Sequence, residues 1–246
     1  MVTIFCLRLA LGMVAPMMIL PAQVVPPRFF RVQFLTALAL LVIGVVLSGS
    51  TGALVLALFA ASIVVCLVGS IVWHTDEAPF GRLLFFAGTG LIAGTLGMLR
   101  LGQDDSPTWL FVDDLASALM LGSAISAMLM GHSYLIAPAM SLSPLNRMLG
   151  LLAAALGVRA GLACLGLSWW TRLSPSATLD RETVLWLAAR WVLGLLFPLG
   201  LAWMAWESAR IRSTQSATGI LYVVTVLVFL GELLSMLLAE KFGFPM

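Results

Sequence analysis

Apolar residues run along this chain in long blocks, without the strict alternation that is typical of half-buried strands. A helix that crosses a bilayer needs about 20 apolar residues, and only helices and closed barrels satisfy their backbone groups inside lipid. Each block is therefore expected to form one membrane-spanning helix. The eight predicted spans are roughly 3–21, 32–48, 53–73, 83–100, 110–136, 147–168, 183–206 and 217–239.

The segments between the blocks are short and rich in helix-breaking and polar residues, as in "HTDEAPFGR" and "TRLSPSATLDRE". The first block lacks a basic leader and is interrupted by Arg8, so we interpret it as a spanning helix and not as a secretory signal. Pro16 and Pro198 are the expected kink positions. The pattern predicts an all-α polytopic membrane protein, a bundle of about eight helices with short loops forming a single domain, 1–246.

Composition supports the bilayer as the surroundings of this chain. Hydrophobic residues make up 61% and charged residues 10%, whereas a soluble domain is about a quarter charged. The net charge is +2 and Lys241 is the only lysine, so no nucleic-acid partner is expected. Cys6, Cys66 and Cys164 lie far apart in apolar blocks, which predicts buried small side chains and no cysteine metal site.

Loop charges predict an orientation. Eight spans place both termini on one face, here called the N-terminal face. The connections on the opposite face carry Arg28, Arg31, Arg82, Arg147, Arg210 and Arg212, against Arg100, Arg172, Arg181 and Lys241 on the N-terminal face. Since cytoplasmic loops are enriched in Lys and Arg, both termini are predicted to be non-cytoplasmic, in the inner (plasma) membrane of a prokaryote. The loop acids Asp104 and Asp105 are expected to be solvated.

Several ionisable residues fall inside the blocks, where a charge costs a few kcal/mol at least. At about 1.5 Å per residue, Arg159, Arg190 and Glu232 share one depth, in a layer roughly 10 Å thick. The same layer holds Arg8, Asp113 and Asp114. We expect the strongest pair to be Arg190 with Glu232, on consecutive antiparallel helices. Two interpretations stay open: an ion-pair lattice that locks helices together, and a proton-relay or substrate site.

Two further patterns concern helix faces. The last block carries a stripe with 4, 3, 4, 3 spacing, which should face protein or water, either for interhelical hydrogen bonding or as the wall of a proton path. The stripe is Thr218, Tyr222, Thr225, Phe229 and Glu232. The GxxxG pairs Gly90–Gly94 and Gly157–Gly161 predict close helix packing.

A second polar group is predicted at the opposite face. His132 and His74 end their spans there, and the neighbouring candidates are Tyr134, Arg210 and Gln215. An imidazole at the lipid boundary can bind a quinone carbonyl or ligate haem. The candidate cofactors are quinone, and haem b with both histidines as axial ligands; interfacial polarity alone is the alternative. We expect no other metal site, and the chain has no P-loop, HExxH or GxSxG motif.

Eight helices with almost no extramembrane mass resemble the quinol-handling membrane subunits of bacterial oxidoreductases such as the polysulfide-reductase type, in size and helix count. The resemblance implies an electron-transfer subunit of a respiratory-type complex that binds quinone or haem, relays protons and depends on partner subunits. Two alternatives remain: a structural membrane anchor of a larger assembly, and a small-solute or ion transporter using Arg190 and Glu232. The lack of a visible internal repeat counts against the transporter.

Overall fold

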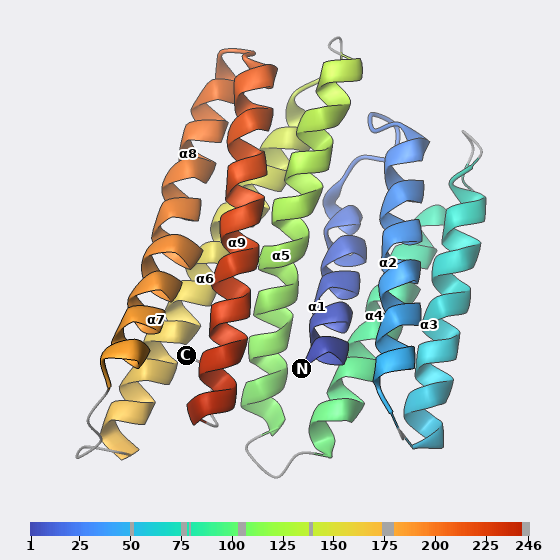
Figure 1. The fold of residues 1–246 in the computed structure, drawn as a ribbon. Helices are drawn as coiled ribbons and strands as arrows, with labels where there is room; N and C mark the ends of the chain where they lie inside the picture. The colour runs from blue at the N-terminus through green and yellow to red at the C-terminus, as the bar shows by residue number, and fades with distance from the viewer. Residues whose placement is uncertain are drawn as a thin grey trace.

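The computed structural model describes residues 1–49, 52–74, 78, 80–102, 107–137, 140–173 and 180–242, and this part of the chain is helical with no strand. The helices run roughly parallel or antiparallel to one another and pack side by side (Figure 1). The elements are α1 (Val2–Val14), η1 (Ala15–Ile19), α2 (Pro27–Leu47), α3 (Ala53–Val72), α4 (Gly81–Leu101), α5 (Pro107–Ile136), α6 (Ser143–Leu173), α7 (Arg181–Trp191), η2 (Val192–Leu196), α8 (Phe197–Arg210) and α9 (Thr214–Phe242).

The prediction of an all-α polytopic membrane protein is confirmed. Eight helical segments in the described ranges are long and apolar enough to cross a bilayer. The first joins α1 to η1, and the seventh joins α7, η2 and α8. Large apolar side chains, such as Val46 and Leu54, are exposed on the outer faces, which suits contact with lipid. Helix α1 begins and α9 ends at the same end of the bundle (Figure 1).

The helices form two bundles of four spans with the same order of neighbours. In the first bundle, α1 packs on α2, α2 on α3, α3 on α4, and α4 on α1. In the second bundle, α5 packs on α6, α6 on α8, α8 on α9, and α9 on α5. The two bundles lie side by side in Figure 1. The arrangement therefore repeats although no repeat was visible in the sequence.

Helices α1 and α5 join the two bundles through a glycine contact. A Cβ atom on Gly122 would overlap the backbone of Gly12, and one on Gly12 would overlap the carbonyl oxygen of Ala118. Because neither glycine carries a side chain, the two backbones touch. This contact places the buried face of α1 directly against α5.

The GxxxG pairs predicted from the sequence do not make such contacts. Cβ atoms added at Gly90, Gly94, Gly157 or Gly161 would meet no heavy atom of the described residues within 4 Å. Spacing identifies small residues on one helix face, but it does not say whether another helix lies against that face. The prediction of packing within the chain was wrong for both pairs.

The seventh span changes its helical hydrogen bonding beside Pro198. Proline has no N–H to donate, and its ring collides with the carbonyl group four residues earlier, that of Gly194. The chain accommodates this with the π-helical segment η2 before α8 begins. Gly194 also lies against Gly231 of α9, where an added Cβ would come within 2.6 Å of the Gly231 Cα. Pro16 likewise falls in the 3₁₀ segment η1. The chain therefore departs from α-helical geometry at Pro16 and next to Pro198, the two positions where a kink was predicted.

The beginning of α7 is tied to the end of α9. Asp180 caps α7 by accepting a hydrogen bond from the Thr183 amide at 3.3 Å, and Lys241 Nζ lies 3.3 Å from its Oδ2. The hydrogen bond from the Thr183 hydroxyl, together with Lys241, holds the pKa of the Asp180 carboxyl below its ordinary value. These contacts connect the first turn of α7 to the last turns of α9.

The glycine contact between the bundles can be tested by substitution. We expect Gly122→Ala to lower the free energy of unfolding by at least about 2 kcal/mol, because its methyl group meets backbone that cannot move aside. Gly90→Ala is the matched control: its methyl group enters open space, so its melting temperature should equal or exceed that of the wild type. Thermal denaturation in detergent measures both, and equal melting temperatures for the two variants would contradict the contact.

Candidate functional site

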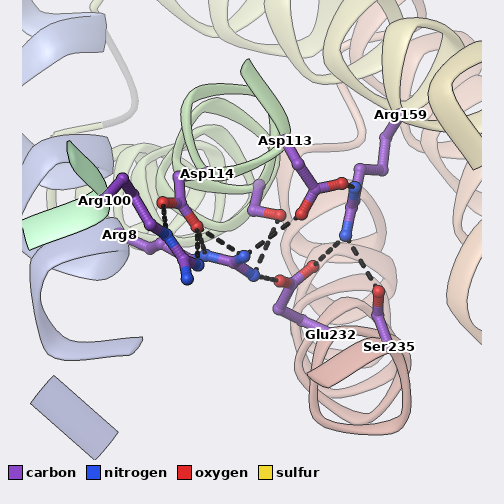
Figure 2. Close-up of polar contacts among 8 residues, drawn as sticks. Arg8, Arg100, Asp113, Asp114, Arg159, Glu232 and Ser235 are labelled. Atoms are coloured by element: carbon purple, nitrogen blue, oxygen red, sulfur yellow. Dashed lines mark hydrogen bonds and ion pairs between the residues drawn. The ribbon is translucent and has the colours of Figure 1, made fainter. Parts of the chain in front are cut away.

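Seven charged side chains are buried in the described structure, and Figure 2 labels six of them, all except Arg190. We call these seven side chains the charge network. Its members are buried in the described structure and come from both bundles. They are Arg8 of α1, Arg100 of α4, Asp113 and Asp114 of α5, Arg159 of α6, Arg190 of α7 and Glu232 of α9.

Arg8 is the centre of the charge network. Its Nε donates to Asp114 Oδ1 at 2.7 Å, and its Nη2 lies 3.1 Å from Asp113 Oδ2. Its Nη1 donates to Glu232 Oε1. One guanidinium of the first bundle thus contacts three carboxylates of the second bundle, which makes Arg8 the main charged link between them.

Arg100 binds Asp114 with two parallel hydrogen bonds. Its Nε lies 2.7 Å from Oδ2 and its Nη2 lies 2.8 Å from Oδ1, a bidentate pair. The sequence assigned Arg100 to the loops of the N-terminal face, because it is the last residue of its predicted span, 83–100. The structure corrects this: Arg100 is only 8% exposed and belongs to the charge network.

Arg159 is a positive partner for Asp113 and Glu232 from within the second bundle. It donates to Asp113 Oδ1 through Nη1 and to Ser235 Oγ at 2.9 Å through Nη2. The same Nη2 lies 3.5 Å from Glu232 Oε2. Asp113 and Glu232 are therefore each shared between Arg8 of the first bundle and Arg159 of the second.

Glu232 has ion-pair partners other than Arg190, with which the sequence predicted its strongest pair. Glu232 makes its ion pairs with Arg8 and Arg159, and Arg190 is not among those partners. Arg190 is fully buried nonetheless, and it interacts electrostatically with Arg159, Glu232 and Asp113. Spacing along the chain correctly placed Arg190 near Glu232 in depth. Which arginines contact Glu232 depends on the rotation of each helix about its axis, which spacing does not give.

The two neighbouring acids on α5 explain how one helix serves both bundles. Consecutive residues of a helix point about 100° apart. Asp114 therefore faces Arg100 on α4, while Asp113 faces Arg159 on α6, and both reach Arg8 (Figure 2). Each of these two carboxylates accepts hydrogen bonds from two arginines. A buried charge requires such partners in a medium of low dielectric.

The candidate cofactor group at the opposite face is not assembled. His74 is exposed and accepts a hydrogen bond from Arg31 at 2.9 Å, whereas His132 is exposed on α5. Helix α3, which ends just before His74, packs on α2 and α4 in the first bundle. Helix α5, which carries His132, belongs to the second bundle, and α1 and α2 lie between α3 and α5 in Figure 1. The fold does not bring His74 and His132 together.

The other members of that group are also dispersed. Tyr134 is fully buried, with its hydroxyl donating to the carbonyl oxygen of Ser141. Arg210 binds Glu207 at 2.9 Å on the surface, and Gln215 is exposed. Within the described ranges, no cluster of three or more His, Cys, Asp or Glu residues forms a metal site. Asp76, Asp104 and Asp105, which the sequence assigned to loops, lie outside the described residues.

A second polar contact between the bundles was missed by the sequence reading. Gln33 of α2 is 1% exposed and its Nε2 donates to Ser126 Oγ of α5 at 3.1 Å. Glutamine carries no charge and Gln33 lies near the start of its span, so nothing in the pattern marked it.

On α9, Thr218 and Glu232 are buried and Thr225 donates to the Ala124 carbonyl at 3.3 Å, while Tyr222 is exposed. The predicted stripe therefore faces protein over part of its length.

No family model, no curated protein and no solved structure matches this chain. The assignment of a function consequently depends on the charge network and on the arrangement of the two bundles.

The contribution of the network to folding can be measured at Asp114. Asp114→Asn leaves Arg8 and Arg100 buried beside a neutral amide, which we expect to cost about 3–5 kcal/mol of unfolding free energy. The matched control is Glu207→Gln, whose partner Arg210 is exposed and where a loss below about 1 kcal/mol is expected. Chemical or thermal denaturation in detergent compares the two. A loss at Asp114 no larger than at Glu207 would show that the network does not stabilise the fold.

Proposed function

We propose that this protein is a small-solute or ion transporter, with the charge network as its translocation site. The observation that supports the proposal is the position of the network, where Arg8 and Arg100 of one four-span bundle bind acids of the other. Transporters assembled from two repeated units hold substrates and coupling ions where the units meet. Because the arrangement of spans repeats, the objection from the missing sequence repeat loses its force.

Energetics favour a functional role over a purely structural one. Replacing a buried ion pair by apolar residues is often neutral or stabilising, so ion pairs are a poor way to hold a fold together. Helices in lipid associate well through small residues, as at the Gly12–Gly122 contact. Seven buried charges at one depth therefore exceed what a structural anchor needs, and ionisable groups in spans commonly mark ion or proton pathways.

The pattern of partners also suits a movement of one bundle against the other. If the bundles separate on the N-terminal face, Asp113 and Glu232 lose Arg8 but keep Arg159, which belongs to their own bundle. Among the described residues, the ion-pair partners of Asp114 are Arg8 and Arg100, both of the first bundle. Separation would leave this carboxylate without a positive partner, so Asp114 is the group expected to take up a proton or water during transport.

A second candidate is the electron-transfer subunit expected from the sequence. Its specific support is His132, an exposed imidazole near the end of α5, where a quinone in the lipid has access. In this function, partner subunits carry the redox centres and the charge network relays protons. For either candidate we place the chain in the inner (plasma) membrane of a prokaryote with both termini non-cytoplasmic, on the balance of arginines between the two faces.

Transport can be tested with the purified chain alone in liposomes. A potassium gradient with valinomycin sets the membrane potential, and fluxes of protons, sodium, chloride and labelled small organic ions are recorded. We expect at least one ion to move faster than in empty liposomes, and Glu232→Gln to reduce that flux at least tenfold because it removes the acid shared by Arg8 and Arg159. Glu207→Gln, which alters an exposed pair, should retain the flux. Equal flux through wild-type and empty liposomes would rule out transport of these ions.

The electron-transfer candidate predicts that the chain is part of a complex with redox subunits. Purification from native membranes in mild detergent should yield redox subunits together with this chain, and His132→Ala should lower quinone-linked activity at least tenfold in a complex that still assembles. Recovery of the chain alone, or unchanged activity in an assembled His132→Ala complex, would exclude this candidate.

A further inference from the structure

Arg31 and His74 form a polar pair at the end of the first bundle that lies opposite the chain termini. Arg31 lies near the start of α2 and His74 follows α3, and Arg31 Nη1 is 2.9 Å from His74 Nδ1. A guanidinium can only donate hydrogen bonds, so Nδ1 accepts and the neutral ring carries its proton on Nε2. His74 is exposed, and this Nε2–H has no acceptor among the described residues.

Arg31 has no carboxylate partner in the part of the chain that the structure describes, where its polar contact is the one with His74. The side chain is half-buried and its Nε is buried without an acceptor, although an arginine stays charged under nearly all conditions. Nε and Nη2 form one edge of the guanidinium, the edge with which Arg100 binds both oxygens of Asp114. The same edge of Arg31 therefore suits an oxyanion, which supplies a negative charge and two acceptors together.

Trp73 connects this pair to the start of α4. Its ring lies 4.3 Å from that of Phe30 on α2, measured between centroids. A Cβ added at Gly81 would come within 2.8 Å of its Cε2, the ring atom bonded to Nε1. Trp73 is 3% exposed and its Nε1 has no acceptor in the described ranges, although a buried indole N–H usually finds one. The exposed Arg82 follows Gly81 directly, so a second arginine lies in the first turn of α4 at the same junction.

These residues lie where the bundle meets the boundary of the membrane. Helix α3 ends, and helices α2 and α4 begin, at the end of the bundle away from both termini (Figure 1). We place this face in the cytoplasm on the balance of arginines, and anionic phosphates of the cytoplasmic leaflet lie at that depth. Phe80, at the beginning of α4, is 80% exposed and offers an apolar contact for an acyl chain.

We infer that Arg31 and His74 bind a phosphate group, that of an anionic phospholipid headgroup in the cytoplasmic leaflet. Nε and Nη2 of Arg31 and Nε2 of His74 donate to the phosphate oxygens, and Arg82 adds positive charge beside them. Trp73 positions His74 by packing between the ends of α2 and α4. A free phosphate ion offers the same oxygens, so the test separates the two sources. The inference does not depend on the transport function proposed above.

Binding is tested by thermal denaturation of the purified protein in mild detergent at constant ionic strength. One series adds dioleoyl phosphatidylglycerol, and a second adds dioleoyl phosphatidylcholine, whose headgroup has the same phosphate but no net charge. A third series adds sodium phosphate without lipid. At about a 100-fold excess over Kd we expect phosphatidylglycerol to raise Tm saturably by about 5 °C, and phosphatidylcholine to raise it by less than about 1 °C.

Three variants assign the effect to the site. Arg31→Gln and His74→Ala should each weaken the apparent affinity for phosphatidylglycerol at least tenfold, because each removes donors to the phosphate. Arg210→Gln is the matched control: it removes an exposed arginine that is paired with Glu207 on the same face, so it should behave as the wild type. If Arg31→Gln does not fold, His74→Ala, at an exposed side chain, decides the question.

The outcomes separate the lipid from free phosphate and from general surface charge. The absence of any rise in Tm with both phosphatidylglycerol and sodium phosphate would overturn the inference, as would an equal rise with phosphatidylcholine. A rise that persists undiminished in Arg31→Gln and His74→Ala, or that Arg210→Gln diminishes equally, would also overturn it. A rise with sodium phosphate alone, lost in Arg31→Gln and His74→Ala, would assign the site to free phosphate and refute the lipid.

Discussion

Lipid cannot solvate a charged side chain, and this constraint organises the structure around the charge network. Arg8, Asp113 and Asp114 are tolerated at membrane depth because each contacts opposite charges from other helices. Removing any one member exposes its partners to the full cost of burial. The positions of α1, α4, α5, α6 and α9 are thereby coupled to one another through charge as well as packing.

Close packing makes those charge contacts possible. Arg8 reaches three acids because Gly12, one turn further along α1, lets the helix lie directly on α5 at Gly122. The contact of Gly194 with Gly231 likewise brings η2 directly against α9, one turn after Arg190. At the first crossing, the absent side chains allow Arg8, one turn before Gly12, to reach the acids of α5.

Because there are two bundles, the charge network contains contacts of two kinds, those within one bundle and those between bundles. The same order of neighbours occurs in both halves, and the network lies where the halves join. Arg159 shares a bundle with Asp113 and Glu232, whereas the ion-pair partners of Asp114 belong to the other bundle. Bonds within a bundle persist when two rigid bodies move, and bonds between bundles exchange, which is the property that the proposed transport function uses.

Sequence alone determined the eight spans and the depth of Arg159, Arg190 and Glu232, because span length and hydropathy are local and the rise per residue is constant. It did not determine which side chains meet. The pairing of Glu232 with Arg8 and Arg159, the inclusion of Arg100, and the separation of His74 from His132 depend on helix neighbours and on rotation about each helix axis. Those are settled by packing between segments distant in sequence. Periodicity names the residues on a face, and only the tertiary structure decides what that face touches.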